Sequence, residues 1–120
     1  MKREITVWLP GETIVPFDEE CSETNSEALE QIFAWFNAGS GNEHRLFKAM
    51  RSLSVGDFVG IDRQWFQCLS IGWRNVSFDF VRKIEDAVQH RMNVAVANNK
   101  QESPWFILNS MKHEQNWPLV

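Results

Sequence analysis

The chain has 120 residues and a formal net charge of −4, with six tryptophans, nine phenylalanines and no tyrosine. A chain of this length forms one domain that buries roughly two thirds of its unfolded surface without disulfides or a metal. Its apolar runs are far shorter than the roughly 20 residues of a membrane helix, and its N-terminus lacks the apolar segment of a signal peptide. We therefore expect no membrane span, a cytoplasmic location, and one domain over residues 1–120, in which residues 75–120 form a C-terminal helix and tail.

The charge is divided unevenly along the chain. Residues 1–44 carry two basic and nine acidic residues, a net −7, whereas residues 45–120 carry ten basic and seven acidic residues, a net +3. Such an asymmetry indicates either an acidic surface that attracts a basic partner or a solvated loop and helix face. Solvation alone is the simpler interpretation of the two.

The first predicted element is a strand over residues 3–9, where apolar and polar residues alternate until Pro10-Gly11 stops the pattern. Trp8 lies on the opposite face of this strand from Ile5, Val7 and Leu9. The acidic segment from Glu12 to Thr24 is predicted to be a loop, because it is irregular and Pro16 disfavours a central strand.

The strongest helix signal covers residues 25–37. Thr24 and Glu27 have the spacing of a capping box, and Asn37-Ala38-Gly39 offers a C-terminal stop. Apolar residues recur at helical spacing, which predicts a buried stripe formed by Leu29, Ile32, Phe33 and Phe36.

The middle of the chain predicts a hairpin. A flexible joint at residues 39–41 is followed by a predicted short helix within residues 42–50, with Leu46, Phe47 and Met50 inward. Strands are then expected at 57–61 and 65–71, joined by Asp62-Arg63-Gln64. The second strand carries bulky apolar residues on both faces, which indicates a central position in the sheet. Gly72 then lets the chain turn, so that Trp73 packs back across the hairpin.

The C-terminal part predicts a helix over residues 78–92 that begins at Ser77 or Asp79, with an inward stripe formed by Val81, Ile84, Val88 and Met92. We expect it to end near Asn93 and a second hairpin to follow at 94–97 and 104–108; a helix that continues past Asn93 is the alternative. The predicted fold class is α+β: a small antiparallel sheet from residues 3–9, 57–61 and 65–71, covered by helices near 25–37 and 78–92.

The segments "PGETI", "IFAWFNAGSGNE" and "RSLSVGDFVGIDRQWFQCLSIGW", within residues 3–74, together resemble a loosely defined group of short, uncharacterised proteins from phages, plasmids and integrative elements. Members of that group read RSLSVGDVV, then a short turn, an aromatic residue, a cysteine and a Gly-Trp pair. The resemblance implies a phage or mobile-element origin, and it supplies no catalytic residue. The motif positions in this chain are Arg51, Gly56, Asp57, Cys68, Gly72 and Trp73.

The residues themselves favour architecture over chemistry at this motif. Gly56 permits a turn and Asp57 bonds nearby backbone amides, while Arg51 pairs with Asp57 or Glu43. Cys68 lies in an apolar strand, which raises the pKa of a thiol and argues against a nucleophile. We expect both cysteines to be reduced, with Cys68 as a buried structural thiol.

Metal, cofactor and catalytic signals are weak. His44, His90 and His113 are far apart, with no His or Cys spacing typical of metal ligands. Residues 39–41 resemble the tip of a phosphate loop, but they follow a helix and lack the downstream Gly-Lys-Ser/Thr. We therefore expect no catalytic residue, no metal, no cofactor and no enzymatic activity.

Two functions compete. Exposed tryptophans are typical of interfaces, although the six here could simply fill a small core. In the first hypothesis the chain presents an acidic, aromatic surface to a basic host protein that acts in defence or in handling nucleic acid, and inhibits it. The residues of this surface are Asp18, Glu19, Glu20, Glu23, Glu27, Glu30 and Trp35. The alternative is nucleic-acid binding, less favoured because the basic residues are scattered; its residues are Arg63, Trp65, Trp73, Arg74 and Arg91. Exposed tryptophans could equally serve a homodimer.

Overall fold

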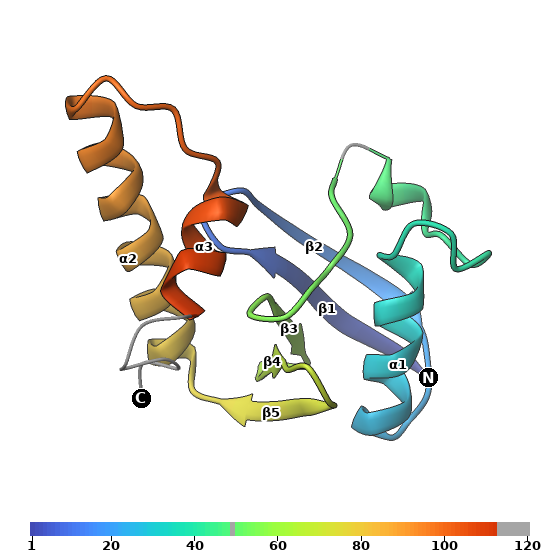
Figure 1. Cartoon of the computed structure of the whole chain (residues 1–120). Coiled ribbons are helices and arrows are strands. Elements are labelled where there is room, and N and C mark those ends of the chain that lie inside the picture. Colours follow the sequence, from blue (N-terminus) through green and yellow to red (C-terminus); the bar gives the residue numbers. More distant parts are fainter. Residues whose placement is uncertain (49, 113–120) are drawn as a thin grey trace.

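A computed structural model describes residues 1–48 and 50–112 (Figure 1). Its centre is a five-stranded, fully antiparallel sheet in the order β2-β1-β3-β4-β5. The strands are β1 (Lys2–Leu9), β2 (Thr13–Glu20), β3 (Phe58–Ile61), β4 (Gln64–Cys68) and β5 (Trp73–Val76). The helices are α1 (Asn25–Trp35), α2 (Phe78–Ala97) and α3 (Pro104–Lys112), with a 3-10 turn at Arg45–Phe47. The predicted α+β class and the internal position of β4 are confirmed.

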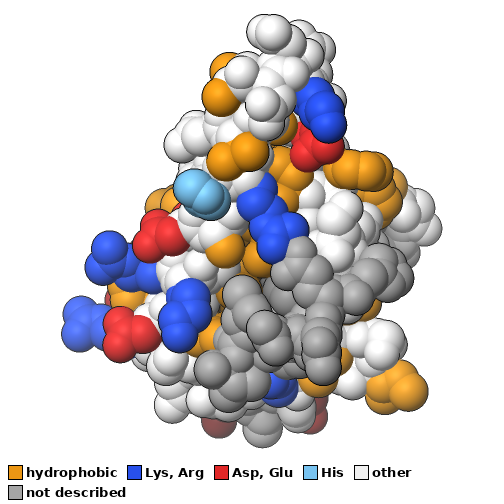
Figure 2. All heavy atoms as spheres, turned by 60° about the vertical axis from the view of Figure 1, so that its left-hand side comes forward, with side chains coloured by type: hydrophobic (Ala, Val, Ile, Leu, Met, Phe, Trp, Pro, Cys, Tyr) orange, Lys and Arg blue, Asp and Glu red, His pale blue; other side chains and the backbone are white. Residues whose placement is uncertain are grey.

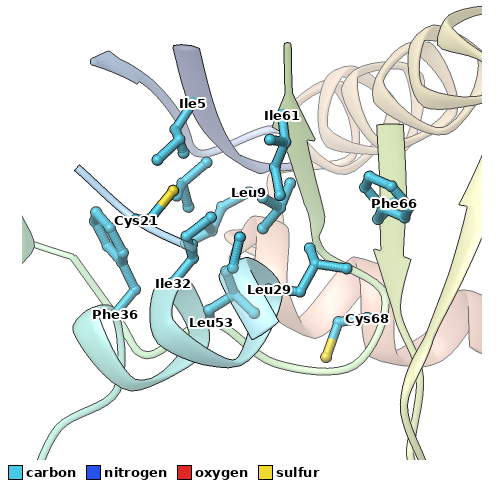
Figure 3. Close-up of a cluster of buried hydrophobic side chains, with 13 residues drawn as sticks. Ile5, Leu9, Cys21, Leu29, Ile32, Phe36, Leu53, Ile61, Phe66 and Cys68 are labelled. Atoms are coloured by element: carbon cyan, nitrogen blue, oxygen red, sulfur yellow. The ribbon is translucent and has the colours of Figure 1, made fainter. Parts of the chain in front are cut away.

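Helix α1 covers one face of the sheet. Its predicted apolar stripe meets alternate residues of β1, β3 and β4, and together they form the first core (Figure 3). Ile5, Leu29, Ile32, Phe36 and Ile61 are among its buried members. The capping-box prediction is wrong in detail: Thr24 precedes the helix but makes no side-chain cap, and Glu27 instead accepts a hydrogen bond from Ser22 Oγ.

Helices α2 and α3 cover part of the opposite face, where Phe58 joins Val81, Ile84, Val88 and Leu108 in a second core. Ser77 caps α2 by accepting a hydrogen bond from the Phe80 amide, as predicted. Glu85 of α2 accepts from Trp8 Nε1 and from the Gly11 amide, both at 2.8 Å, and so fixes the β1–β2 turn against the helix.

The β3–β4 connection is a two-residue turn. Asp62 and Arg63 both have positive φ, at 47° and 70°, and Ile61 pairs with Gln64 across the turn. Positive φ at both central residues is the geometry of the tight turn that suits the twist of a hairpin. The predicted hairpin is therefore confirmed, but its connection is one residue shorter than predicted, because Gln64 is the first residue of β4.

Three sequence predictions about secondary structure are wrong. The segment predicted as an acidic loop contains β2, an edge strand, which tolerates Pro16 because an edge needs no donor on its outer side. The predicted second hairpin is instead the end of α2, which continues to Ala97 as the alternative had it, followed by α3. Strand β4 ends at Cys68, and Ile71 lies 90% exposed in the turn before β5.

Candidate protein-binding site

Arg3 anchors the N-terminus of α1 to the sheet. Its side chain is 7% exposed and donates to the carbonyls of Ser22 and Glu23, at 3.0 and 3.1 Å, and to Asn25 Oδ1 at 2.6 Å. Its Nε also pairs with Asp62 in the β3–β4 turn at 2.8 Å, and this contact lowers the pKa of Asp62. One guanidinium thus fixes where the first turn of α1 lies.

A groove opens between the N-terminal half of α1 and strand β5, which we call the α1 groove. Its volume is about 680 Å³. Leu29, Phe66 and Trp73 supply hydrophobic side chains to it, and Glu27 and Glu30 lie among the residues that line it from α1. Phe33 contacts Trp73 edge to face, with ring centroids 6.2 Å apart, so that α1 and β5 also meet directly.

A second hollow lies on the other side of β5, where the strand leads into α2. Its volume is about 320 Å³, and Val76, Asp79, Phe80 and Lys83 are among the residues that line it. Arg74 lies with its guanidinium 5.0 Å from the centre of the Phe80 ring. Since Asn75 lines both hollows, strand β5 forms the ridge between them.

The structure divides the predicted acidic surface. Glu23, Glu27 and Glu30 are exposed at the start of α1 and, within residues 1–48 and 50–112, take part in no ion pair. Asp18 and Glu20 point instead from the opposite side of the sheet, where Glu20 pairs with the N-terminal amine at 2.8 Å. The six predicted residues therefore do not form one patch.

Glu19 is engaged within the molecule. His44 Nε2 lies 2.6 Å from its carboxylate and Arg45 Nη1 lies 3.3 Å away. The hydrogen bonds from these two side chains lower the pKa of Glu19 below its usual range. Glu19 is therefore already paired and contributes little free charge to a partner.

The tryptophans separate into packed and exposed groups. Trp35 is half-buried against the His44 ring, 5.5 Å between centroids, so the structure does not place it as an exposed anchor. Trp8 and Trp65 meet edge to face at 5.7 Å on the α2 side of the sheet. Trp105 is 43% exposed on α3. Trp117 and His113 lie outside the described residues.

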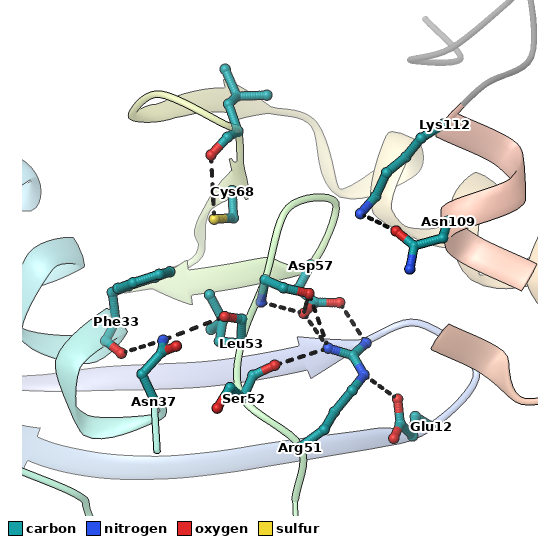
Figure 4. Close-up of polar contacts among 12 residues, drawn as sticks. Glu12, Phe33, Asn37, Arg51, Ser52, Leu53, Asp57, Cys68, Asn109 and Lys112 are labelled. Carbon is teal, nitrogen blue, oxygen red and sulfur yellow. Dashed lines mark hydrogen bonds and ion pairs between the residues drawn. The ribbon is translucent and has the colours of Figure 1, made fainter. Parts of the chain in front are cut away.

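The central motif builds the hairpin that carries β5, and Figure 4 shows the polar contacts of three of its residues, Arg51, Asp57 and Cys68. The Gly56 amide donates to the Cys68 carbonyl at 2.8 Å, and the Cys68 amide donates to the Asp57 carbonyl at 2.9 Å. This pattern, with Gly56 at φ 98°, is a β-bulge that opposes two residues to one. The glycine is required because other residues rarely adopt this φ.

Asp57 is fully buried and holds the loop before the bulge. Arg51 donates to both of its carboxylate oxygens, at 2.7 and 2.9 Å, and the Ser54 amide donates to it at 2.8 Å. Arg51 also pairs with Glu12 at 2.8 Å, and not with the predicted alternative, Glu43. Glu43 accepts from backbone amides of residues 39 and 41. Arg51 and Asp57 of the central motif therefore hold the loop in place.

Cys68 is 4% exposed, and burial raises the pKa of its thiol to about 11. Its Sγ lies 3.7 Å from the Leu69 carbonyl. Cys21 is also buried, and both thiols are free. Across the described residues no cluster of three or more potential ligands could hold a metal ion. The predicted buried location of Cys68 agrees with this geometry.

Sequence reasoning missed most of the groove. Leu29 and Phe66 were expected in the core, and Trp73 was expected to pack across the hairpin, but nothing in their spacing indicates that their edges line an open surface. Asn75 was not singled out at all. The isolated basic residues Lys2 and Arg3 in the acidic first part of the chain are a signal for the ion pair of Arg3, but not for the groove.

Comparison with protein-family models, curated proteins and solved structures gives no match. None of the helices among the described residues has the length and hydrophobicity to cross a membrane.

Proposed function

We propose that this protein is a non-enzymatic binding protein that contacts a basic partner protein through the α1 groove. One observation carries the proposal: two exposed carboxylates, Glu27 and Glu30, line the groove together with hydrophobic side chains of the sheet, and a third, Glu23, is exposed just before α1. Hydrophobic side chains within a charged border are typical of protein interfaces. The resemblance to phage and mobile-element proteins suggests that the partner belongs to the host and acts in defence or in handling nucleic acid.

The electrostatics support a basic partner. The positive end of the α1 dipole offsets part of the negative charge and stabilises the helix, but full charges remain at the surface. Carboxylates at the rim of an interface chiefly accelerate association and select partners of opposite charge. A lysine or arginine of the partner beside Glu27 or Glu30 would supply this opposite charge.

Nucleic-acid binding has less support. Register places Trp73 on the α1 side of the sheet and Trp65 on the α2 side, while Arg74 is occupied by Gln67 at 3.0 Å and by the Phe80 ring. On the face that Figure 2 shows, blue and red side chains lie next to one another among hydrophobic ones. Nucleic-acid sites usually concentrate basic residues in one stripe, and this described surface does not.

Affinity capture from a host lysate tests the proposal, with the wild-type chain compared against the double variant Glu27→Gln/Glu30→Gln. The amide side chains keep the shape of the site and remove two charges. We expect a captured protein of basic character, bound at least severalfold more weakly by the variant, with a smaller dependence on salt.

The matched control is Glu4→Gln/Asp18→Asn. These two residues face each other across β1 and β2 on the other side of the sheet, and both are exposed. The control changes net charge by the same amount and should bind as the wild type does. Equal binding by all three proteins, or equal loss in both variants, would contradict a specific role for the α1 groove.

A further inference from the structure

The free edge of β5 presents main-chain groups that no described segment uses. The Cys68 amide and carbonyl point toward β3, because they bond Asp57 and Gly56. In an antiparallel pair, bonded and non-bonded positions alternate. Cys68 pairs with Trp73 and Phe66 pairs with Asn75, so the N–H and C=O groups of Trp73 and Asn75 point away from β4. Figure 1 shows β5 at the margin of the sheet, with no described strand beyond it.

The two hollows lie on either side of this edge. Side chains of an added strand would point alternately to the α1 groove and to the hollow beside α2, because successive residues face opposite sides of a sheet. Residues two apart in that strand are about 7 Å apart and face the same hollow. The edge therefore offers hydrogen bonds for the main chain and separate spaces for alternate side chains.

We propose that β5 accepts an extended segment of the partner protein as a sixth strand. The segment would place an apolar side chain against Leu29, Phe66 and Trp73, and a lysine or arginine two residues away beside Glu27 or Glu30. Recognition of this kind takes affinity from the main chain and specificity from the alternate pockets. This inference rests on the proposed function and assigns its mode of binding.

Charge selects a partner peptide over a second copy of this chain. Pairing of two β5 strands around a twofold axis would bring together two α1 groups of Glu23, Glu27 and Glu30, with like charges facing each other. A basic extended segment would instead meet these carboxylates with opposite charge. Within the described residues none of the three takes part in an ion pair, and Glu27 accepts a hydrogen bond from the neutral Ser22 hydroxyl, so their negative charges remain available for that contact.

A defined probe tests this mode directly. The probe is an acetylated, amidated octapeptide in which threonine alternates with leucine and lysine, labelled with fluorescein and titrated into the whole chain. We expect saturable binding by fluorescence anisotropy. In amide hydrogen exchange followed by NMR, the amides of Trp73 and Asn75 should exchange at least tenfold more slowly when the peptide is bound. No saturable binding to the wild type would overturn the proposal.

Asn75→Pro is the decisive variant. It removes one of the two outward N–H groups of β5 and leaves the β4–β5 hydrogen bonds intact, as proline is tolerated where an edge residue faces solvent. We expect peptide binding at least tenfold weaker. Asn75→Ala is the matched control, because it shortens the same side chain and keeps the N–H, so it measures what the side chain that lines the two hollows contributes; Asn75→Pro should bind at least tenfold more weakly than Asn75→Ala. Amide spectra of both variants would show that the fold is retained.

The outcomes separate this inference from the proposed function. If Glu27→Gln/Glu30→Gln weakens binding but Asn75→Pro does not, the acidic surface binds without strand addition and the inference alone fails. If neither variant weakens binding, both fail. Protection of the Trp73 and Asn75 amides that rises with protein concentration in the absence of peptide would identify a second copy as the occupant and overturn the inference. If the NMR signals of residues that line the α1 groove shift on peptide binding while the Trp73 and Asn75 amides stay unprotected, the peptide binds as a helix. This result would also overturn the inference.

Discussion

The two edges of the sheet differ in how they meet solvent. Strand β2 has eight residues and carries Pro16, and the bond from the Cys21 amide to the Met1 carbonyl places Pro16 at a position whose N–H side points outward. Its outward positions also carry Asp18 and Glu20. Strand β5 has four residues, with neither proline nor acid, and a hollow on each side. Proline and charge are common protections against pairing with other chains. The molecule protects one edge and leaves the other suited to a partner.

The largest expected effect concerns the support of the β5 edge. Asp57→Ala would leave the half-buried Arg51 guanidinium and the Ser54 amide without this acceptor, so we expect the free energy of unfolding to fall by about 2–3 kcal/mol. Urea unfolding measures this loss. Hydrogen exchange should show β4 and β5 opening before β2. In contrast, Glu12→Gln removes only the outer ion pair of Arg51 and should cost less than about 1 kcal/mol. Equal effects of the two changes would refute the assigned role of Asp57.

The reactivity of the Cys68 thiol tests whether the same hairpin is closed to solvent, because Cys68 pairs with Trp73 of β5. With a pKa of about 11 against the usual 9.0, the native thiol has about a hundredfold less thiolate at neutral pH. A Cys21→Ser variant isolates Cys68. We expect its reaction with a disulfide reagent to be at least a hundredfold slower in the native protein than in urea. Similar rates in both states would mean that Cys68 is open to solvent.

Removing Pro16, which protects the edge strand β2 from pairing, should have a smaller effect, and this effect is on self-association. Pro16→Thr restores an outward N–H to the middle of this edge, and one additional hydrogen bond is worth roughly 1 kcal/mol, or about fivefold in self-association. Sedimentation at increasing concentration would measure this rise. Ile14→Thr keeps the existing outward N–H and serves as the control. If Pro16→Thr stays as monomeric as the control, proline is not what protects this edge.

The smallest expected effect depends on pH. The folded-state pKa of Glu19 is lowered by His44 and Arg45, so its contribution to stability is present above its unfolded pKa near 4.5 and is lost as the pH falls through the folded value. Glu19→Gln should therefore reduce the free energy of unfolding by less than about 1 kcal/mol at pH 7, because the carboxylate is partly exposed. The difference should vanish in strong acid. Thermal unfolding at several pH values checks this, and a constant difference would contradict it.

The sequence predicts the centre of this fold better than its edges. The stripes that begin with Leu29 and Val81 and the hairpin at Asp62 follow from spacing alone, since each pattern is local. Strand β2 was missed because Pro16 and its acids are typical of a loop, and an edge strand needs burial on one face only. Helix α3 was also missed, although Ser103 before Pro104 is a common helix start, and Ser103 Oγ does accept from the Phe106 amide.

The candidate site was predicted only in part. The acidic character of Glu23, Glu27 and Glu30 is visible in the sequence, but their separation from Asp18 depends on which side of β2 each residue faces. The groove itself depends on where α1 lies on the sheet, and Arg3 and its partners hold the start of this helix. Contacts between residues so distant in the chain leave no periodic trace in one sequence.

Gly60 lies beneath the indole of Trp65, and a methyl group at this position would come within 3.0 Å of the ring. The indole therefore rests on bare backbone in the middle of the sheet. Almost any mutation of this codon would displace the ring, which leaves position 60 with little freedom to drift during evolution. A survey of natural variants should find that glycine and tryptophan at these two positions are retained or lost together.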